Sequence, residues 1–217
     1  GEMANAVTDS ASGCDLTYGA IASGRINPNA ATDNIETMTL SASPGNSTDN
    51  GELVTGIREH GSGASNVGGG SVYVLGGNPG NSSVETFNVQ LSPSTVTDWG
   101  ELSLTGPLGN TRFSACSDNT NLFSAGGYND ASDVSRKIID QWAFSTGGAA
   151  TDWGDLAYLT RDTASNSGVT YMWTSGGVSP PNTIASEVDR FSASSAANAA
   201  DQGDMTTNKS FHYGTEV

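Results

Sequence analysis

Four copies of one sequence phrase constrain this chain more than any single residue does. Each copy has a short apolar segment ending in small residues, a loop, a tetrad of the form apolar–acid–x–apolar, and an Asp-x-Gly-acid motif followed by Leu or Met. The tetrads begin at Ile35, Val84, Ile139 and Val188, so they are separated by 49, 55 and 49 residues. A unit of about fifty residues that recurs is one supersecondary element that cannot bury its own apolar face alone. The sequence therefore predicts four similar units packed on one another.

The Asp-x-Gly motifs follow the tetrads at a nearly constant distance. Their residues are Asp49 and Gly51, Asp98 and Gly100, Asp152 and Gly154, and Asp201 and Gly203. An Asp side chain can accept a hydrogen bond from its own backbone two residues on, and Gly tolerates a positive φ. We therefore expect a turn at this motif and the last strand of each unit directly after it. A single carboxylate per turn is too few for calcium, which binds six or more oxygens, so we expect no metal here.

Glycine pairs close the apolar segments of three units. They are Gly76 and Gly77, Gly126 and Gly127, and Gly176 and Gly177. We expect them to permit a bulge or a close approach of neighbouring backbones, and not to bind phosphate, because no helix follows them. The first unit has Ser23 before Gly24, and the second has the glycine-rich segment 61–70 where a small-residue strand is expected. These two units are expected to be irregular or to carry an altered edge.

An acid recurs at the second position of every tetrad. These acids are Glu36, Glu85, Asp140 and Asp189. An acid inside a strand could be catalytic, but four copies at the repeat spacing favour a role in the architecture. We expect these carboxylates to bind backbone amides of an adjacent unit or to face solvent.

The composition and patterning favour an all-β fold. Helix formers are scarce, and no window has apolar residues at the spacing of a helix face over three turns. We expect four strands per unit: one near 112–117 and its equivalents, one on the apolar segment, one on the tetrad and one after Asp-x-Gly. Four short antiparallel strands in about fifty residues are typical of a blade of a kelch-type β-propeller. We predict one domain over 1–217, with repeats at approximately 4–53, 54–102, 103–156 and 157–205 and a partial repeat at 206–217.

The two ends of the chain carry the same part of the phrase. Gly1-Glu2-Met3 matches Gly203-Asp204-Met205, so residues 206–217 realign with residues 4 to 15. We expect the four repeats to be a window of a longer array whose polypeptide continues beyond one or both ends.

The second half of the chain resembles a known family. The stretch Tyr171 to Pro181, then Glu187 to Phe191, then Asn198 to Met205, is similar to kelch-like repeats of marine tailed-phage structural proteins of the cyanophage or pelagiphage type. Residues 139–156 fit the same pattern, and Ser114 to Ser117 looks like the family's first strand. The resemblance implies a virion component at the particle surface, such as a tail fibre, head fibre or decoration subunit. It brings no catalytic residues with it.

Charge and residue usage exclude several classes of function. The net charge of −15 disfavours nucleic acid and anionic membranes as partners, and no apolar run is long enough to span a membrane. No signal peptide is visible. His60 and His212 are the only histidines and lie in unlike contexts, so no metal site or cofactor is expected. The six Arg residues are scattered, which disfavours a sialidase-like propeller. We predict no enzymatic activity. Cys14 and Cys116 lie at equivalent points of the first and third units and are expected to be buried and unbridged.

Four aromatic residues are candidates for ligand binding: Trp99, Trp153, Tyr128 and Trp173. Aromatic faces beside Asn, Asp and Ser side chains suit carbohydrate recognition, whereas packing between blades is the alternative that the usual burial of Trp favours. If a glycan site exists, we expect it in the variable loops, which are Arg25 to Asn34, Asn78 to Ser83, Tyr128 to Ile138 and Val178 to Glu187.

These observations lead to a functional hypothesis. We expect a non-enzymatic virion protein that contacts other virion subunits and attaches the particle to the host surface, with host carbohydrate as a possible ligand. One alternative is a scaffold or decoration protein that holds virion subunits together. Another is part of a secreted propeller enzyme or adhesin whose active part lies elsewhere.

Overall fold

The fold is all-β in the part of the chain that the structure describes, as the sequence predicts. The structure, a computed structural model, describes residues 2–3, 9–26, 30–41, 43, 45–57, 62–66, 68–78, 82–103, 111–129 and 132–210. Within these ranges there is no helix, and hence none long and apolar enough to cross a membrane. His60 and His212 lie outside the described residues.

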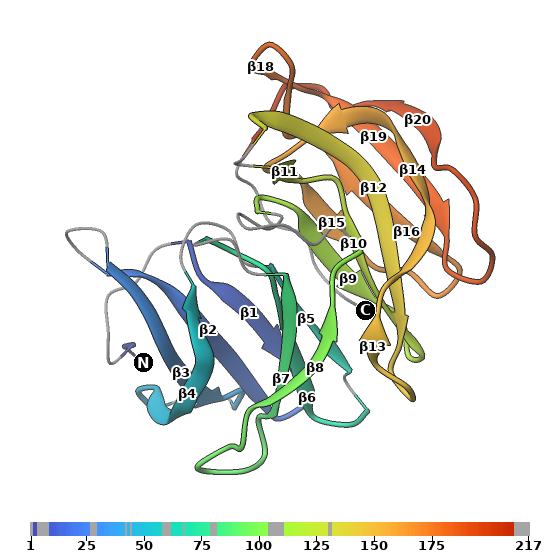
Figure 1. Cartoon of the computed structure of the whole chain (residues 1–217). Helices are drawn as coiled ribbons and strands as arrows, with labels where there is room; N and C mark the ends of the chain where they lie inside the picture. Colours follow the sequence, from blue (N-terminus) through green and yellow to red (C-terminus); the bar gives the residue numbers. More distant parts are fainter. Residues whose placement is uncertain are drawn as a thin grey trace.

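Each sequence unit forms one antiparallel sheet whose four main strands follow one another in chain order (Figure 1). Sheet 1 contains β1 (Ala11–Cys14), β2 (Tyr18–Ile26), β3 (Ala30–Thr39) and β4 (Thr48–Ile57). Sheet 2 contains β5 (Ser62–Asn66), β6 (Ser71–Leu75), β7 (Ser83–Asn88) and β8 (Thr97–Glu101). Sheet 3 contains β9 (Ser114–Ser117), β10 (Asn121–Ala125), β12 (Val134–Ala143) and β14 (Thr151–Thr160). Sheet 4 contains β15 (Ala164–Asn166), β16 (Tyr171–Ser175), β19 (Glu187–Ser192) and β20 (Ala200–Asp204).

Four two-residue strands lie beside these sheets in the described part of the chain. β11 (Tyr128–Asn129) pairs with β12 at the edge of sheet 3. β13 (Gly148–Ala149) runs parallel to β8 and so ties sheet 3's last hairpin to sheet 2. β17 (Val178–Ser179) and β18 (Thr183–Ile184) form a separate hairpin beside sheet 4.

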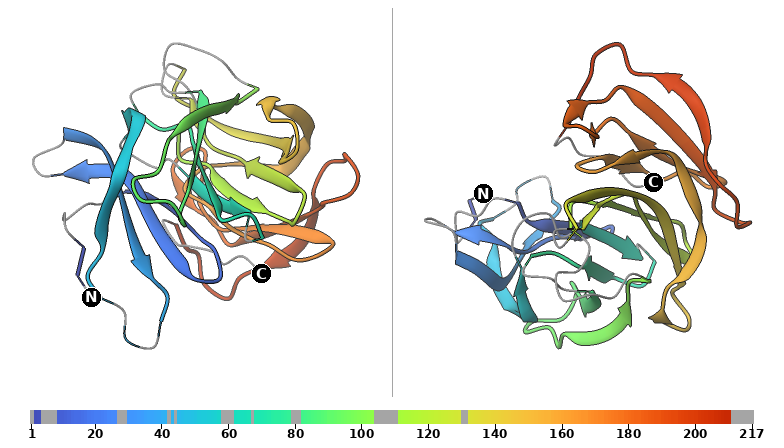
Figure 2. Two further views of the ribbon diagram at one scale, coloured as in Figure 1. Left: turned by 90° about the horizontal axis from the view of Figure 1, so that it is seen from below. Right: turned by 45° about the horizontal axis from the view of Figure 1, so that its top comes forward.

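The core lies between successive sheets. One apolar cluster joins sheets 1 and 2, a second joins sheets 2 and 3, and a third joins sheets 3 and 4. Side-chain alternation along a strand produces this arrangement: Val72 and Val74 of β6 face sheet 1, whereas Tyr73 and Leu75 face sheet 3. The first strands β1, β5, β9 and β15 contact one another in that order. Figure 2 shows the sheets following one another along a curved path.

The Asp-x-Gly motif is a bulge inside the fourth strand, so the predicted turn before that strand is wrong. In sheet 3, Ile139 pairs with Gly154 but Asp140 pairs with Asp152, which leaves Trp153 as the extra residue. Asn50 and Trp99 occupy the same place in sheets 1 and 2. The motif distorts the strand without ending it, because the hydrogen bond of the Asp side chain spans only two residues. The carboxylate accepts the Gly N–H two residues on, at 3.0 Å for Asp49, 3.0 Å for Asp152 and 2.7 Å for Asp201.

The glycine pairs bring backbones close together. All six glycines have positive φ, from 53° at Gly76 to 115° at Gly77. A Cβ on Gly177 would lie 2.4 Å from the carbonyl oxygen of Arg161. Ser23 adopts φ of 59° in the position of the first glycine. The pairing of β2 with β3 shifts register at Ser23 and continues beyond it, so the irregularity expected of the first unit is present. In the second unit, β5 pairs with β6 without a register shift.

The two cysteines differ in burial, which corrects the prediction that both are buried. Cys116 is buried, Cys14 is exposed, and no disulfide joins them. Cys14 pairs with Gly19, whereas Cys116 pairs with Phe123, whose counterpart in sheet 1 is Ala20. The two cysteines are therefore one residue out of register, and a shift of one residue moves a side chain to the opposite face of a sheet.

The close approach at the glycine pair can be separated from backbone strain by two substitutions. Gly177→Ala and Gly203→Ala both place a side chain at positive φ, at 99° and 106°, which costs about 1–3 kcal/mol. Only the first also meets neighbouring atoms, since no atom of the described residues lies within 4 Å of the Cβ position at Gly203. We expect Gly177→Ala to lower the free energy of unfolding in urea clearly more than Gly203→Ala. Equal losses would contradict the close approach.

Candidate functional site

The tetrad acids connect neighbouring sheets. Glu85 accepts hydrogen bonds from the backbone N–H groups of Val54 at 2.8 Å and Thr55 at 3.2 Å. Asp140 accepts from the N–H of Ser103 at 3.2 Å, and Asp189 accepts from that of Ala157 at 2.9 Å. The donors directly follow Leu53, Leu102 and Leu156 of the preceding unit. The prediction that these acids bind backbone amides of an adjacent unit is therefore confirmed at three positions.

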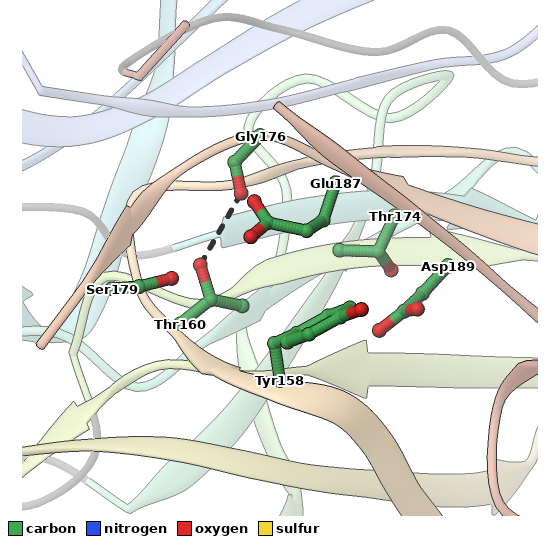
Figure 3. A pocket seen from close by; sticks show the side chains of 7 residues that line it. All are labelled: Tyr158, Thr160, Thr174, Gly176, Ser179, Glu187 and Asp189. Atoms are coloured by element: carbon green, nitrogen blue, oxygen red, sulfur yellow. Dashed lines mark hydrogen bonds between the residues drawn. The ribbon is translucent and has the colours of Figure 1, made fainter. Parts of the chain in front are cut away.

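A small polar pocket lies between sheets 3 and 4 beside the last of these acids (Figure 3). Its lining residues are Tyr158, Thr160, Thr174, Gly176, Ser179, Glu187 and Asp189. Thr160 donates its hydroxyl to the carbonyl of Gly176 at 3.2 Å. Three buried atoms of the lining residues have no hydrogen-bond partner among the described residues: Thr174 Oγ1, Ser179 Oγ and Asp189 Oδ1. The pocket therefore offers oxygen atoms to a small hydrogen-bond donor, for which a bound water is the simplest occupant.

Burial shifts the titration of these acids. Desolvation raises the pKa of Asp189 above its ordinary value, against the opposing bond from Ala157, and the charges of Asp201 and Glu187 raise it further. Desolvation also raises the pKa of Asp140, whose Oδ1 likewise has no hydrogen-bond partner among the described residues. A raised carboxyl pKa in a pocket is a common mark of catalysis. Here the raised pKa occurs at the same repeat position in Asp140 and Asp189, so the packing of one sheet on the next explains it.

The raised pKa values predict how stability depends on pH. For a carboxyl whose folded pKa is raised, the contribution to stability is complete below the unfolded pKa, about 3.9 for Asp, and is lost as the pH rises through the folded pKa. We expect Asp189→Asn to flatten the fall in the free energy of unfolding across that window, because its amide cannot ionise. Urea unfolding at a series of pH values measures this slope.

A matched control for that experiment is Glu52→Gln, which removes an exposed carboxylate of β4. Its slope should follow that of the unmodified chain. An Asp189→Asn variant whose slope also follows the unmodified chain would show that burial of Asp189 has no influence on stability.

Tyr128, Arg112, Arg161 and Asp162 form a second polar site, which we call the Tyr128 cluster. The guanidinium carbons of Arg161 and Arg112 lie 4.6 and 5.5 Å from the centre of the Tyr128 ring. The buried carboxylate of Asp162 lies 3.6 Å from Arg161 and 3.7 Å from Arg112. The Arg161 guanidinium also donates to the hydroxyl of Ser135 at 3.1 Å and to the side-chain oxygen of Asn182 at 2.6 Å. Asn182 is exposed and lies in the loop between β17 and β18.

Backbone pairing brings two of the four variable loops to this cluster. Thr111 bridges to Tyr128, and Arg161 bridges to Val178, so the loops Tyr128 to Ile138 and Val178 to Glu187 meet there. Arg112 and Asp162, which stand just before the first strands of sheets 3 and 4, have positive φ of 59° and 56°. Such strained backbone persists only where its surroundings hold it in place.

The expectation that the Arg residues are scattered is wrong for Arg112 and Arg161, and this cluster is therefore not predicted from the sequence. Arg112 and Arg161 approach one ring, although 49 positions separate them. The available signal was the dipeptide Thr-Arg, which occurs at Thr111-Arg112 and again at Thr160-Arg161, one repeat apart.

The four predicted binding aromatics do not form one site. Trp99 packs on Tyr73 with ring centres 4.7 Å apart, between sheets 2 and 3. Trp153 packs on Phe123 at 5.8 Å, between sheets 3 and 4, and donates its indole N–H to the carbonyl of Ser192 at 2.8 Å. Tyr128 belongs to the loop cluster, and its hydroxyl donates to Asp133. Trp173 lies on sheet 4 beside Arg190, at 5.5 Å. The bulge tryptophans therefore serve packing.

This difference between the tryptophans can be measured. Trp153→Ala removes an indole packed against the core and leaves the carbonyl of Ser192 without its donor, so we expect a loss of about 3 kcal/mol in the free energy of unfolding. Trp173→Ala removes a half-buried ring that stacks on an Arg, for which about 1 kcal/mol or less is expected. Chemical denaturation of both variants tests the contrast, and similar losses would contradict it.

Comparison with known proteins shows the fold alone. No protein-family model and no curated protein matches the chain. Among solved structures, the chain is similar to "Structure of YjhT", with a TM-score of 0.75 and 14% sequence identity, over 97% of this chain and 69% of that chain. At this identity the likeness carries no information about ligand or activity.

Proposed function

We propose that the chain is a segment of a kelch-like β-propeller in which each sheet is one blade. The contacts between first strands support a common axis, because the first strands of successive sheets approach one another more closely than the fourth strands do, as in sheets that fan out from an axis. Face-to-face packing through three apolar clusters and the amide bonds of the tetrad acids supply the blade-to-blade contacts.

We propose further that the segment is a non-enzymatic structural component of a tailed-phage virion. The observation that carries this proposal is that the groups that recur in the sequence are used for packing. The tetrad acids bind backbone amides of the neighbouring sheet, and Trp99 and Trp153 fill the spaces between sheets. A rigid frame of repeats suits a tail fibre, head fibre or decoration subunit that contacts other virion subunits at the particle surface. The virion assignment itself comes from the repeat pattern of residues 139–205.

Attachment to the host surface is the role in the particle that we favour. Two of the four loops of variable length meet at the Tyr128 cluster, and variable loops on a rigid scaffold are where binding sites usually lie. The ring of Tyr128 with Asp133, Ser135 and Asn182 around it provides the stacking face and hydrogen-bonding groups that carbohydrate requires. Decoration of the capsid or tail without host contact is the alternative role.

The virion assignment predicts where the protein is found. An antibody raised against the chain should label the surface of intact particles of the phage that encodes it, as seen by immunogold electron microscopy. Labelling restricted to unassembled material in the lysate would contradict the assignment.

Purified chain should in addition bind host cells, and Asn182→Ala, which alters an exposed loop residue of the cluster, should weaken that binding. Particle labelling without cell binding would favour decoration.

A further inference from the structure

The pocket between sheets 3 and 4 is lined by oxygen-bearing groups. Its lining residues carry two carboxylates, hydroxyls and the backbone carbonyl of Gly176, and none of them has a nitrogen atom in its side chain (Figure 3). The space accommodates a single occupant about the size of a water molecule. Such a lining suits an occupant that is small and attracted to oxygen.

Three of the lining oxygens are buried and unsatisfied. Thr174 is 3% exposed and Asp189 is 5% exposed, and neither Thr174 Oγ1 nor Asp189 Oδ1 has a hydrogen-bond partner among the described residues. The same holds for Ser179 Oγ. Figure 3 shows the Thr174 hydroxyl and the Asp189 carboxylate turned toward the same space. Because buried polar atoms normally have a partner, three without one around a single space indicate an occupant that contacts them all.

The charge of the site favours a cation over a water molecule. Burial raises the pKa of Asp189, and the charges of Asp201 and Glu187 raise it further. In the described part of the chain, no Lys or Arg forms an ion pair with any of these three acids. A water molecule can donate hydrogen bonds to the carboxylates but leaves their charge uncompensated. A cation satisfies the oxygens and compensates the charge as well.

The second carboxylate distinguishes this pocket from the equivalent place in the preceding interface. Asp140 is the counterpart of Asp189 and also has a buried Oδ1 without a partner among the described residues. Glu187 stands two residues before Asp189 on β19 and so shares its face of the sheet. Its counterpart in sheet 3 is the apolar Ile138. The packing of one sheet on the next therefore explains the tetrad acid but does not explain Glu187.

We propose that this pocket binds a calcium ion through the carboxylates of Asp189 and Glu187 and the hydroxyls of Thr174 and Ser179. Calcium takes oxygen ligands in flexible geometry, and water completes its coordination where the protein supplies fewer than six. Its two positive charges balance the two carboxylates. Magnesium demands a near-ideal octahedron and gives up its own water reluctantly, so it suits this site less well. The proposal goes beyond the virion role and does not depend on it.

Calcium binding can be measured on the full chain. Equilibrium dialysis against calcium chloride, with sodium chloride added to screen the net charge of −15, should show one saturable site per chain. With two carboxylates we expect a Kd on the order of 1 mM or somewhat below. Urea unfolding gives a second readout, because calcium at ten times its Kd should raise the folding equilibrium constant about elevenfold.

Three variants test where the ion binds. Asp189→Asn and Glu187→Gln each remove one carboxylate with little change in shape, and each should weaken calcium binding by about tenfold or more. Asp140→Asn is the matched control, because it removes a buried acid at the same repeat position of an interface whose neighbouring residue is Ile138. It should leave the calcium affinity unchanged.

Four results would overturn the proposal. The first is a folding equilibrium that does not respond to calcium up to about 10 mM, which would leave water as the occupant. The second is binding that Asp189→Asn and Glu187→Gln both leave unchanged. The third is an equal loss of binding in Asp140→Asn, and the fourth is an equal response to magnesium, which would indicate general screening. Circular dichroism checks the fold of each variant. If Asp189→Asn does not fold, the half-buried Glu187→Gln decides alone.

Discussion

The structure depends on the burial of two apolar faces per sheet. A strand such as β6 sends Val72 and Val74 to one side and Tyr73 and Leu75 to the other, and all four are buried. Such a sheet cannot be stable in water by itself, because both of its apolar faces would be exposed. Sheets 2 and 3 each supply half of two cores, and sheets 1 and 4 each supply half of one, so the repeat of the sequence requires the sheets to stack.

Polar groups then fix the register of one sheet on the next. Apolar contacts alone are non-directional and would tolerate sliding. A carboxylate such as Glu85, which accepts two amides of the preceding sheet, has one position in which both bonds form. Burial raises the pKa of all three carboxyls, and among the described residues Asp140 Oδ1 and Asp189 Oδ1 have no hydrogen-bond partner. The same carboxylates therefore fix the register between two sheets and lose their contact with water.

Much of the fold could be predicted from the sequence, because the same residue types recur at the same positions of every unit and make the same interactions there. The period, the all-β class and the amide bonds of the tetrad acids follow from residue types at fixed spacing. The bulge at Trp153 could not be distinguished from a turn, since Asp and Gly favour both and only cross-strand pairing decides. The exposure of Cys14 depended on a register shift of one residue. The approach of Arg112 and Arg161 to Tyr128 is a contact between units, which spacing within a unit does not reveal.

The location of the variable loops has a physical reason. Interface residues such as Ile139 and Leu156 each touch a neighbouring sheet, so a change in one unit must be matched in the next. None of the described residues of the loop after Gly127 belongs to the three apolar clusters, and this loop holds eleven residues before the tetrad, whereas the loop after Gly77 holds six. The third sheet keeps its four main strands in order despite the longer loop. A frame held by its interfaces can therefore vary its loop surface, where the Tyr128 cluster lies, without losing the stacking that makes it stable.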